Sequence, residues 1–164
     1  MINNKMKRDE LKANPEKATS RVSINSFMIG SLFFILTLIL TLGPDKFSIF
    51  IISQLVLAIP LLFISSLAYA KISYRAKSMT FDKYGWIAHT LGNNMVLNAF
   101  GLMAAIYFRT VGILYFVLAL VTIILYYIID SKHDPSQSRE NLIKVIFILI
   151  IFAVGGIYPL LSSL

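Results

Sequence analysis

The chain has 164 residues, of which 57% are hydrophobic and only 14% are charged, and its formal net charge is +7. A soluble domain carries about 25% charged residues, and a chain this small cannot hide so much apolar surface in its own core, so the composition excludes an ordinary soluble globule. The sequence contains no cysteine, which excludes disulfides, thiolate metal sites, iron–sulfur clusters and cysteine catalysis.

Residues 1–22 form a polar and basic segment that we expect to be a cytoplasmic tail. The tail contains Asp9, Glu10 and Glu16, and the residues after the first apolar run make a poor cleavage site, which argues against a signal or transit peptide. We therefore expect the first apolar run to be a retained membrane anchor.

Five apolar runs follow, each roughly 20 residues long, which is the length of a helix that crosses the hydrocarbon core. They carry no Asp, Glu or Arg, and the only Lys is Lys144 at the edge of the last run. Backbone groups in hydrocarbon must pair locally, so the sequence predicts an all-α, polytopic bundle of about five transmembrane helices in one domain over residues 23–164. The helices are expected at about 24–42, 47–70, 85–108, 110–129 and 143–161.

The short connectors predict antiparallel neighbours, and the basic residues predict the orientation. Gly43-Pro44-Asp45 and the stretch 107–110 are short enough to join adjacent helices as hairpins. Of the 15 Lys and Arg residues, only Lys46 and Arg109 fall on one side of the predicted membrane. Basic residues concentrate on the cytoplasmic side, so we expect a cell-membrane protein with its amino terminus inside and its carboxyl terminus outside.

The charge bias also indicates the expected partners. The basic inner loops should contact the bilayer and its anionic lipid headgroups, rather than nucleic acid. Because the bias favours one orientation, any homo-oligomer should be parallel, and a second membrane protein is the other expected partner. We find no internal repeat, so the inverted-repeat architecture of larger transporters is not predicted within one chain.

The third apolar run carries polar side chains that are unusual inside a membrane helix. With residues about 100° apart around a helix, one histidine and three asparagines fall on one half of its surface. On the second run, Gln54 belongs to a face of small and polar residues at helical spacing. An amide facing lipid would lack partners, so we expect the stripe to face protein. The candidate ligand-binding or pathway residues are His89, Asn93, Asn94, Asn98, Gln54 and Thr90.

Three functions fit such a stripe, and the sequence leaves all three open. In the first, a small multi-pass membrane protein binds or conducts a small polar solute or ion at the stripe. In the second, the chain is a non-catalytic membrane subunit or scaffold whose stripe serves helix packing or partner binding. In the third, it is a membrane enzyme with an active site at the cytoplasmic face, built from Asp82, His89 and Asp130.

The sequence assigns no catalytic residue, no metal site and no cofactor. No nucleophile–base–acid arrangement can be read from it, and a two-histidine haem site lacks its partner because His133 falls in a predicted loop. Asp130, His133 and Asp134 have the spacing of metal ligands on a helix face, but Lys132 and Pro135 favour a solvated helix end.

The last apolar run contains Gly155 and Gly156, followed by Pro159. Glycine lets a neighbouring helix approach closely, and proline removes a helical hydrogen bond. We expect close packing or a bend at this point.

Overall fold

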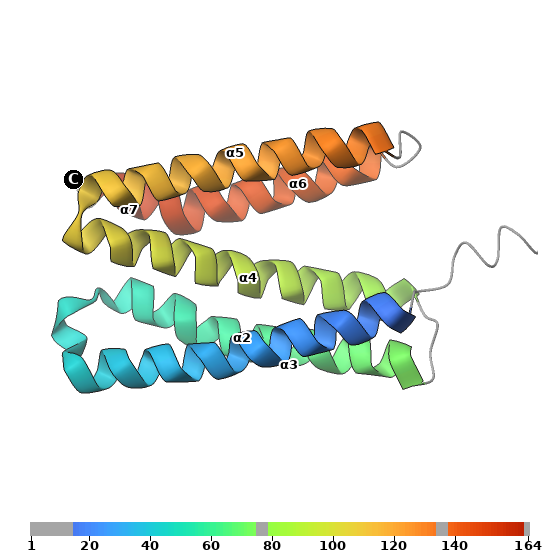
Figure 1. Ribbon diagram of the computed structural model, residues 1–164, viewed down its shortest axis with the longest axis horizontal. Coiled ribbons are helices and arrows are strands. Elements are labelled where there is room, and N and C mark those ends of the chain that lie inside the picture. The colour runs from blue at the N-terminus through green and yellow to red at the C-terminus, as the bar shows by residue number, and fades with distance from the viewer. Residues whose placement is uncertain (1–14, 75–78, 134–137, 163–164) are drawn as a thin grey trace, which may run out of the picture. The chain divides into compact units, whose positions relative to one another are not determined.

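The computed structural model describes residues 15–74, 79–133 and 138–162, and the regular structure of these residues is entirely helical (Figure 1). Because α6, η3 and α7 follow one another without a break, the described chain forms five long helical segments, and the predicted all-α fold is confirmed. The elements are α2 (Pro15–Leu42), the 3-10 turn η1 (Pro44–Lys46), α3 (Ile49–Tyr74), α4 (Met79–Tyr107), α5 (Arg109–His133), α6 (Ser138–Phe152), the π-helical turn η3 (Ala153–Ile157) and α7 (Tyr158–Ser162).

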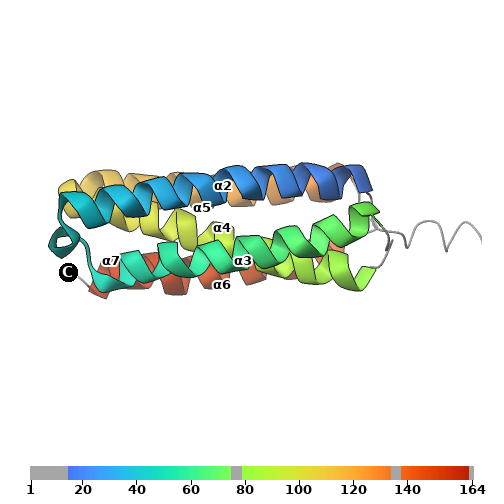
Figure 2. The ribbon, with the colours of Figure 1, turned by 90° about the horizontal axis from the view of Figure 1, so that it is seen from below.

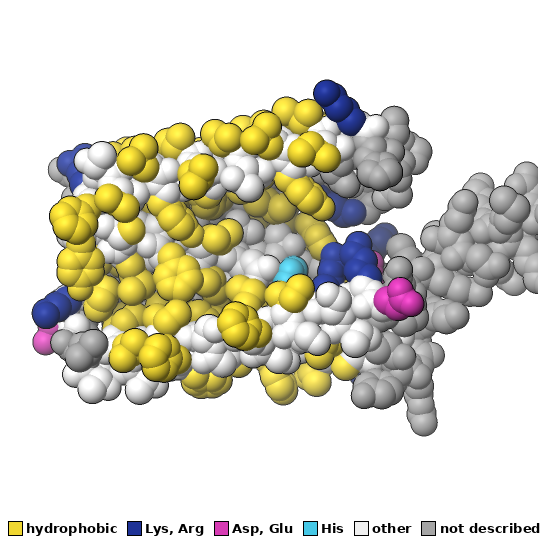
Figure 3. Space-filling view, in the orientation of Figure 1, with side chains coloured by type: hydrophobic (Ala, Val, Ile, Leu, Met, Phe, Trp, Pro, Cys, Tyr) yellow, Lys and Arg dark blue, Asp and Glu magenta, His cyan; other side chains and the backbone are white. Residues whose placement is uncertain are grey.

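Four helical segments are long and apolar enough to cross a membrane. They are Glu16–Thr41, Ile49–Ile72, Arg109–Ile129 and Asn141–Ser162. Hydrophobic side chains cover much of the face seen in Figure 3, and basic side chains gather toward the helix ends. Such extensive apolar exposure is unfavourable in water and normal in lipid. The helix α4 is not among the four, because its histidine and asparagines lower its hydropathy, so a crossing by α4 stays a prediction.

The first helix connection shows how local sequence sets helix ends. Pro15 opens α2, a position where its missing N–H costs nothing. Gly43 follows α2 with φ of 135°, a backbone conformation that side chains disfavour, and its carbonyl accepts a bond of 3.2 Å from the Lys46 N–H. Ser48 then precedes α3, and its carbonyl accepts from the Ile51 N–H at 3.0 Å. The connector is a tight turn, as the sequence predicted.

The chain divides into two compact units, which we describe separately. Unit 1 contains Met1–Leu42 and Val56–Asn93, and unit 2 contains Gly43–Leu55 and Asn94–Leu164. The helices α3 and α4 therefore contribute to both units. The boundary in α4 falls inside the polar stripe.

In unit 1, α2 packs against the unit 1 parts of α3 and α4. Figures 1 and 2 both show α2 and this part of α3 running antiparallel. Their apolar contact includes Ala18, Tyr69 and Ile72, with Val22 and Phe81 packed around them. Small residues bring the backbones close: a Cβ added at Gly92 would lie 2.9 Å from Leu62 Cγ.

In unit 2, α5 packs beside α6 (Figure 1). Phe116 of α5 is 3% exposed, and its ring meets that of Phe152 edge to face at 5.2 Å between centroids. Phe108 is the one residue between α4 and α5 that is not helical, which makes the predicted hairpin at 107–110 very short.

Candidate functional site

A chain of hydrogen bonds joins α2, α3 and α4 within unit 1. Asn93 Nδ2 donates to His89 Nε2 at 3.0 Å, and His89 Nδ1 donates to Asn25 Oδ1 at 2.7 Å. Asn25 Nδ2 donates to Ser65 Oγ at 3.1 Å, and Ser65 Oγ donates to the Gly85 carbonyl at 2.9 Å. Four side chains from three helices thus form one connected path.

The donors and acceptors in this path are mutually consistent. Asn25 Nδ2 also lies 3.4 Å from the Leu62 carbonyl, so its two acceptors settle which end of the amide is the donor. The Asn25 oxygen must then accept from His89, which assigns the imidazole proton to Nδ1 and leaves Nε2 to accept from Asn93. Both ring nitrogens of a neutral imidazole are therefore occupied by protein partners.

A charged cluster lies on the same helix faces. Arg21 donates to the Tyr69 hydroxyl, stands 4.9 Å from the centroid of the Tyr69 ring, and has Asp82 at 4.0 Å. Arg21 and Tyr69 are each one helical turn from a member of the hydrogen-bond path, Asn25 and Ser65 respectively. The cluster therefore extends the polar contact between α2, α3 and α4.

The enzyme hypothesis requires Asp82, His89 and Asp130 to meet. Asp82 already faces Arg21, and both nitrogens of His89 have partners. Asp130 belongs to unit 2, and its side chain lies outside the described residues. Within the described ranges, no three His, Asp or Glu side chains are placed to hold a metal ion. The side chains of His133 and Asp134, which share metal-ligand spacing with Asp130, are also outside the part of the chain that the structure describes.

Unit 2 holds a second polar cluster, around the π-helical turn η3. Gln54 Nε2 of α3 donates to the Gly155 carbonyl at 3.1 Å, and Asn98 Nδ2 of α4 donates to the Ile151 carbonyl at 3.3 Å. A π-turn changes the helical bonding pattern and occurs often at functional sites. Here carbonyls in and beside the turn accept bonds from amides on two other helices.

Both amide side chains of this cluster are buried, and the oxygen atom of each lacks a hydrogen-bond partner among the described residues. Gln54 is 6% exposed and Asn98 is 0% exposed. Gln54 Oε1 and Asn98 Oδ1 have no hydrogen-bond partner among the described residues, and the same holds for Asn93 Oδ1 in unit 1. A buried acceptor without a donor costs about 1–3 kcal/mol, so each of these oxygens weakens the helix contact in which it lies.

Gly155 and Gly156 explain how Asn98 reaches the backbone of η3. A Cβ added at Gly155 would collide with Asn98 Nδ2, and one at Gly156 would lie 2.7 Å from Asn98 Oδ1. The close approach that the sequence predicted at these glycines is present, and the neighbours that use it are the Asn98 amide and, at Gly156, also the Phe116 ring.

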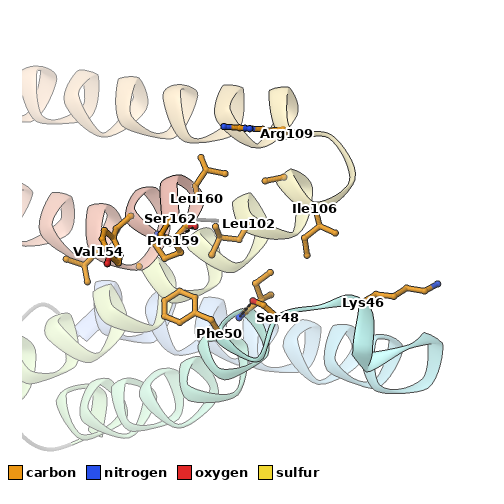
Figure 4. Close-up of a pocket in the computed structure, with 14 residues that line it drawn as sticks. Lys46, Ser48, Phe50, Leu102, Ile106, Arg109, Val154, Pro159, Leu160 and Ser162 are labelled. Carbon is orange, nitrogen blue, oxygen red and sulfur yellow. Dashed lines mark hydrogen bonds between the residues drawn. The ribbon is translucent and has the colours of Figure 1, made fainter. Parts of the chain in front are cut away.

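A cavity of about 820 Å³ opens in unit 2 beside this cluster (Figure 4). This volume is within the range of small-molecule pockets, about 300–1,000 Å³. Gly155 belongs both to the cavity wall and to the polar cluster. The described residues that line it are Lys46, Ser48, Phe50, Ile51, Leu102, Ala105, Ile106, Arg109, Val154, Gly155, Tyr158, Pro159, Leu160 and Ser162.

The six predicted site residues belong to both units, and whether they share one site stays a prediction. His89 and Asn93 join the path in unit 1, whereas Gln54 and Asn98 meet η3 in unit 2. Thr90 and Asn94 are buried, at 6% and 4% exposure, and each has an interaction partner. None of the six is among the residues that line the cavity.

Sequence reasoning missed Asn25, which accepts from His89 and donates to Ser65. The signal was present, because Asn25 is the one amide side chain in the first apolar run. An amide alone in an apolar helix needs a partner on another helix, and His89 was the natural candidate.

No family model matches the chain, and no curated protein and no solved structure matches it. The class of protein is therefore inferred from helix length, hydropathy and the burial of polar residues. Five helical segments, of which four are apolar and long enough to cross a bilayer, together with buried polar residues between helices, define a candidate multi-pass helical membrane protein.

Proposed function

We propose that this chain is a non-catalytic multi-pass membrane protein, a subunit or scaffold, whose polar stripe joins its helices. The observation that carries the proposal is the path from Asn93 through His89, Asn25 and Ser65 to the Gly85 carbonyl. The path uses both nitrogens of the histidine in contacts within the protein. In lipid, where apolar contacts alone drive little association, such interhelical bonds help to select which helices pair.

A double-mutant cycle between Asn25 and His89 tests this packing role. The single variants Asn25→Ala and His89→Ala should each destabilise the protein, and the double variant should lose less than the sum of the two. Interhelical hydrogen bonds in membrane proteins show coupling energies averaging about 0.6 kcal/mol and reaching about 1.7. We expect the upper part of that range, because the bond measures 2.7 Å and Asn25 is fully buried. The measurement is the free energy of unfolding in mixed micelles.

Ser26→Ala combined with His89→Ala is the matched control for that cycle. Ser26 neighbours Asn25, but its hydroxyl bonds the Val22 carbonyl of its own helix at 2.9 Å, so its coupling to His89 should vanish within about 0.3–0.5 kcal/mol. If the Asn25–His89 coupling is no larger than this control, the packing proposal is wrong.

One observation in unit 2 supports the hypothesis that the protein binds a polar solute or ion. Gln54 Oε1 and Asn98 Oδ1 are buried acceptors without partners, one helical turn from the cavity residues Phe50, Ile51 and Leu102. A solute with N–H or O–H donors would satisfy them. We rank this function second, because the cavity itself is lined mainly by apolar side chains.

The same proposal includes five membrane crossings with the amino terminus in the cytoplasm. The sequence has no cysteine, so any single introduced cysteine is a unique label site. On intact cells, an impermeant maleimide should label Asp45→Cys and Phe108→Cys, and should label Thr80→Cys and Lys132→Cys only after permeabilisation. All four positions are exposed. The expectation follows from the two basic residues on the outer side against all others on the inner side.

The pair Thr80→Cys and Phe108→Cys tests α4, because the two positions flank its apolar stretch. Labelling of both from the same side would show that α4 does not cross, and the five-crossing topology would then be wrong. Labelling of Asp45→Cys only after permeabilisation would show that the proposed orientation is inverted.

A further inference from the structure

The cavity of unit 2 combines apolar walls with positive charge. Arg109 of α5 and Lys46 of η1 both belong to its lining, with the Lys46 side chain extending outward, and the other lining side chains are mainly apolar, with Ser48 and Ser162 among them (Figure 4). No carboxylate is among the described residues that line it, although Asp45 adjoins Lys46 in sequence. The cavity is therefore matched to a ligand that carries an acidic group and a long apolar portion.

Arg109 and Lys46 are both found where a segment able to cross a membrane begins. Arg109 begins one segment able to cross a membrane, and Lys46 comes just before another, which begins at Ile49. In a bilayer both charges would lie where hydrocarbon meets headgroups, and the cavity walls formed by Leu102, Val154 and Leu160 would extend toward the hydrocarbon. In a bilayer, such a groove would take up an acyl chain more readily than water, because water has few partners on apolar walls.

We propose that the cavity binds one membrane lipid with an anionic phosphodiester headgroup, its phosphate held by the exposed, flexible side chains of Arg109 and Lys46 at the cavity rim and an acyl chain against Leu102, Val154 and Leu160. The planar guanidinium of Arg109 can pair two oxygens of a phosphate, and Lys46 adds a flexible point charge. Within unit 2, Arg109 begins α5 and the basic residue Lys132 lies near the other end of that helix, so the site differs from general attraction to the inner surface. The inference rests on the proposed membrane insertion.

Tryptophan fluorescence can report on this lipid directly. Trp86 is the single tryptophan, so Trp86→Phe supplies a dark background and Phe50→Trp places a reporter in the cavity wall. The full-length protein is reconstituted in vesicles of phosphatidylcholine with a small fraction of brominated phosphatidylglycerol or of brominated phosphatidylcholine. We expect the brominated phosphatidylglycerol to quench Phe50→Trp with an apparent affinity about fivefold higher, the factor that one basic residue near an anionic group supplies.

The charge variants decide whether the cavity causes that preference. Adding Lys46→Gln and Arg109→Gln should abolish it, while Lys132→Gln, which removes an exposed charge outside the cavity, should leave it unchanged. The two substitutions remove positive charge from the outer side, so they also reinforce the expected orientation. Equal quenching by the two lipids, or a preference that survives the double variant, would overturn the proposal. Displacement by millimolar inorganic phosphate would also overturn it, in favour of a site for the free anion.

A second reporter separates failure of this inference from failure of membrane insertion. Leu114 is 61% exposed on α5 and does not line the cavity, so Leu114→Trp in the same background should be quenched by both brominated lipids alike. If neither lipid quenches Leu114→Trp, that part of α5 is not in lipid and the proposed function fails. If both quench Leu114→Trp but Phe50→Trp shows no headgroup preference, only the lipid site fails.

Discussion

Phe116→Ala should strongly destabilise unit 2. The Phe116 side chain is 3% exposed and packs edge to face against Phe152 and Tyr115, with ring centroids 5.2 and 5.7 Å away. In soluble cores, truncation of a buried phenylalanine costs about 3–5 kcal/mol. In lipid part of the transfer term is absent, but the lost dispersion contacts and the cavity remain, so we expect a loss of about 2 kcal/mol or more.

Unfolding of Phe116→Ala in mixed micelles measures this loss, and Phe27→Ala is the matched control. Phe27 is 78% exposed, and its truncation should change the free energy of unfolding by no more than about 0.5 kcal/mol. Equal losses in the two variants would contradict the packing assigned to Phe116.

Gly101 supplies a stricter test of the same contact. A Cβ at Gly101 would lie 2.6 Å from Cζ of Phe116, so Gly101→Ala should destabilise the native protein. In the Phe116→Ala background that ring is gone, but Tyr115 Cδ1 would still lie 2.8 Å from the added Cβ, so the same substitution should destabilise clearly less than it does in the native protein. A loss of the same size in both backgrounds would show that the ring of Phe116 does not cause it.

Gly112→Ala should destabilise the protein, although Gly30→Ala should stabilise it. A Cβ at Gly112 would collide with Ala105 Cβ and would lie 2.8 Å from Ala105 Cα and 3.0 Å from its nitrogen. Backbone atoms cannot move aside as a flexible side chain can, so α4 and α5 must separate. Overpacking of this kind costs about 1–3 kcal/mol, which exceeds the helix-propensity gain of at most about 1 kcal/mol from glycine to alanine.

Gly30 is the matched control because the substitution is identical and the surroundings differ. An added Cβ at Gly30 meets nothing within 4 Å among the described residues, so only the propensity gain remains. The two variants should therefore shift the free energy of unfolding in opposite directions. A shift of the same sign in both would show that the close approach at Gly112 does not limit stability.

Much of the fold could be predicted because its cause is local. Each apolar run is long enough for one membrane helix, and backbone in hydrocarbon has no other stable way to pair its polar groups. The connector at 43–45 was readable because glycine, proline and aspartate favour turns, and the one at 107–110 because Arg109 separates two apolar runs. Helix ends were less accurate: α4 begins at Met79, whereas only its apolar part from 85 was predicted.

The candidate site was harder to predict because its partners come from distant parts of the chain. Sequence placed His89, Asn93, Asn94 and Asn98 on one half of a helix. It could not show that Asn25 completes the bonds of His89, or that Asn98 turns to the Ile151 carbonyl. A helical wheel orders the residues of one helix and carries no information about which neighbour each one meets.

By itself, then, the sequence determined an all-α chain with apolar segments of membrane length and a polar stripe that needs protein partners. Only the tertiary structure decided that His89 and Asn93 of the stripe join a hydrogen-bond network in unit 1, and that Asn98 bonds the Ile151 carbonyl in unit 2. It also decided that the cavity forms among apolar side chains next to Arg109 and Lys46. Hydropathy acts residue by residue and can be read along the chain, whereas partner choice depends on which helix backbones approach closely enough for a hydrogen bond.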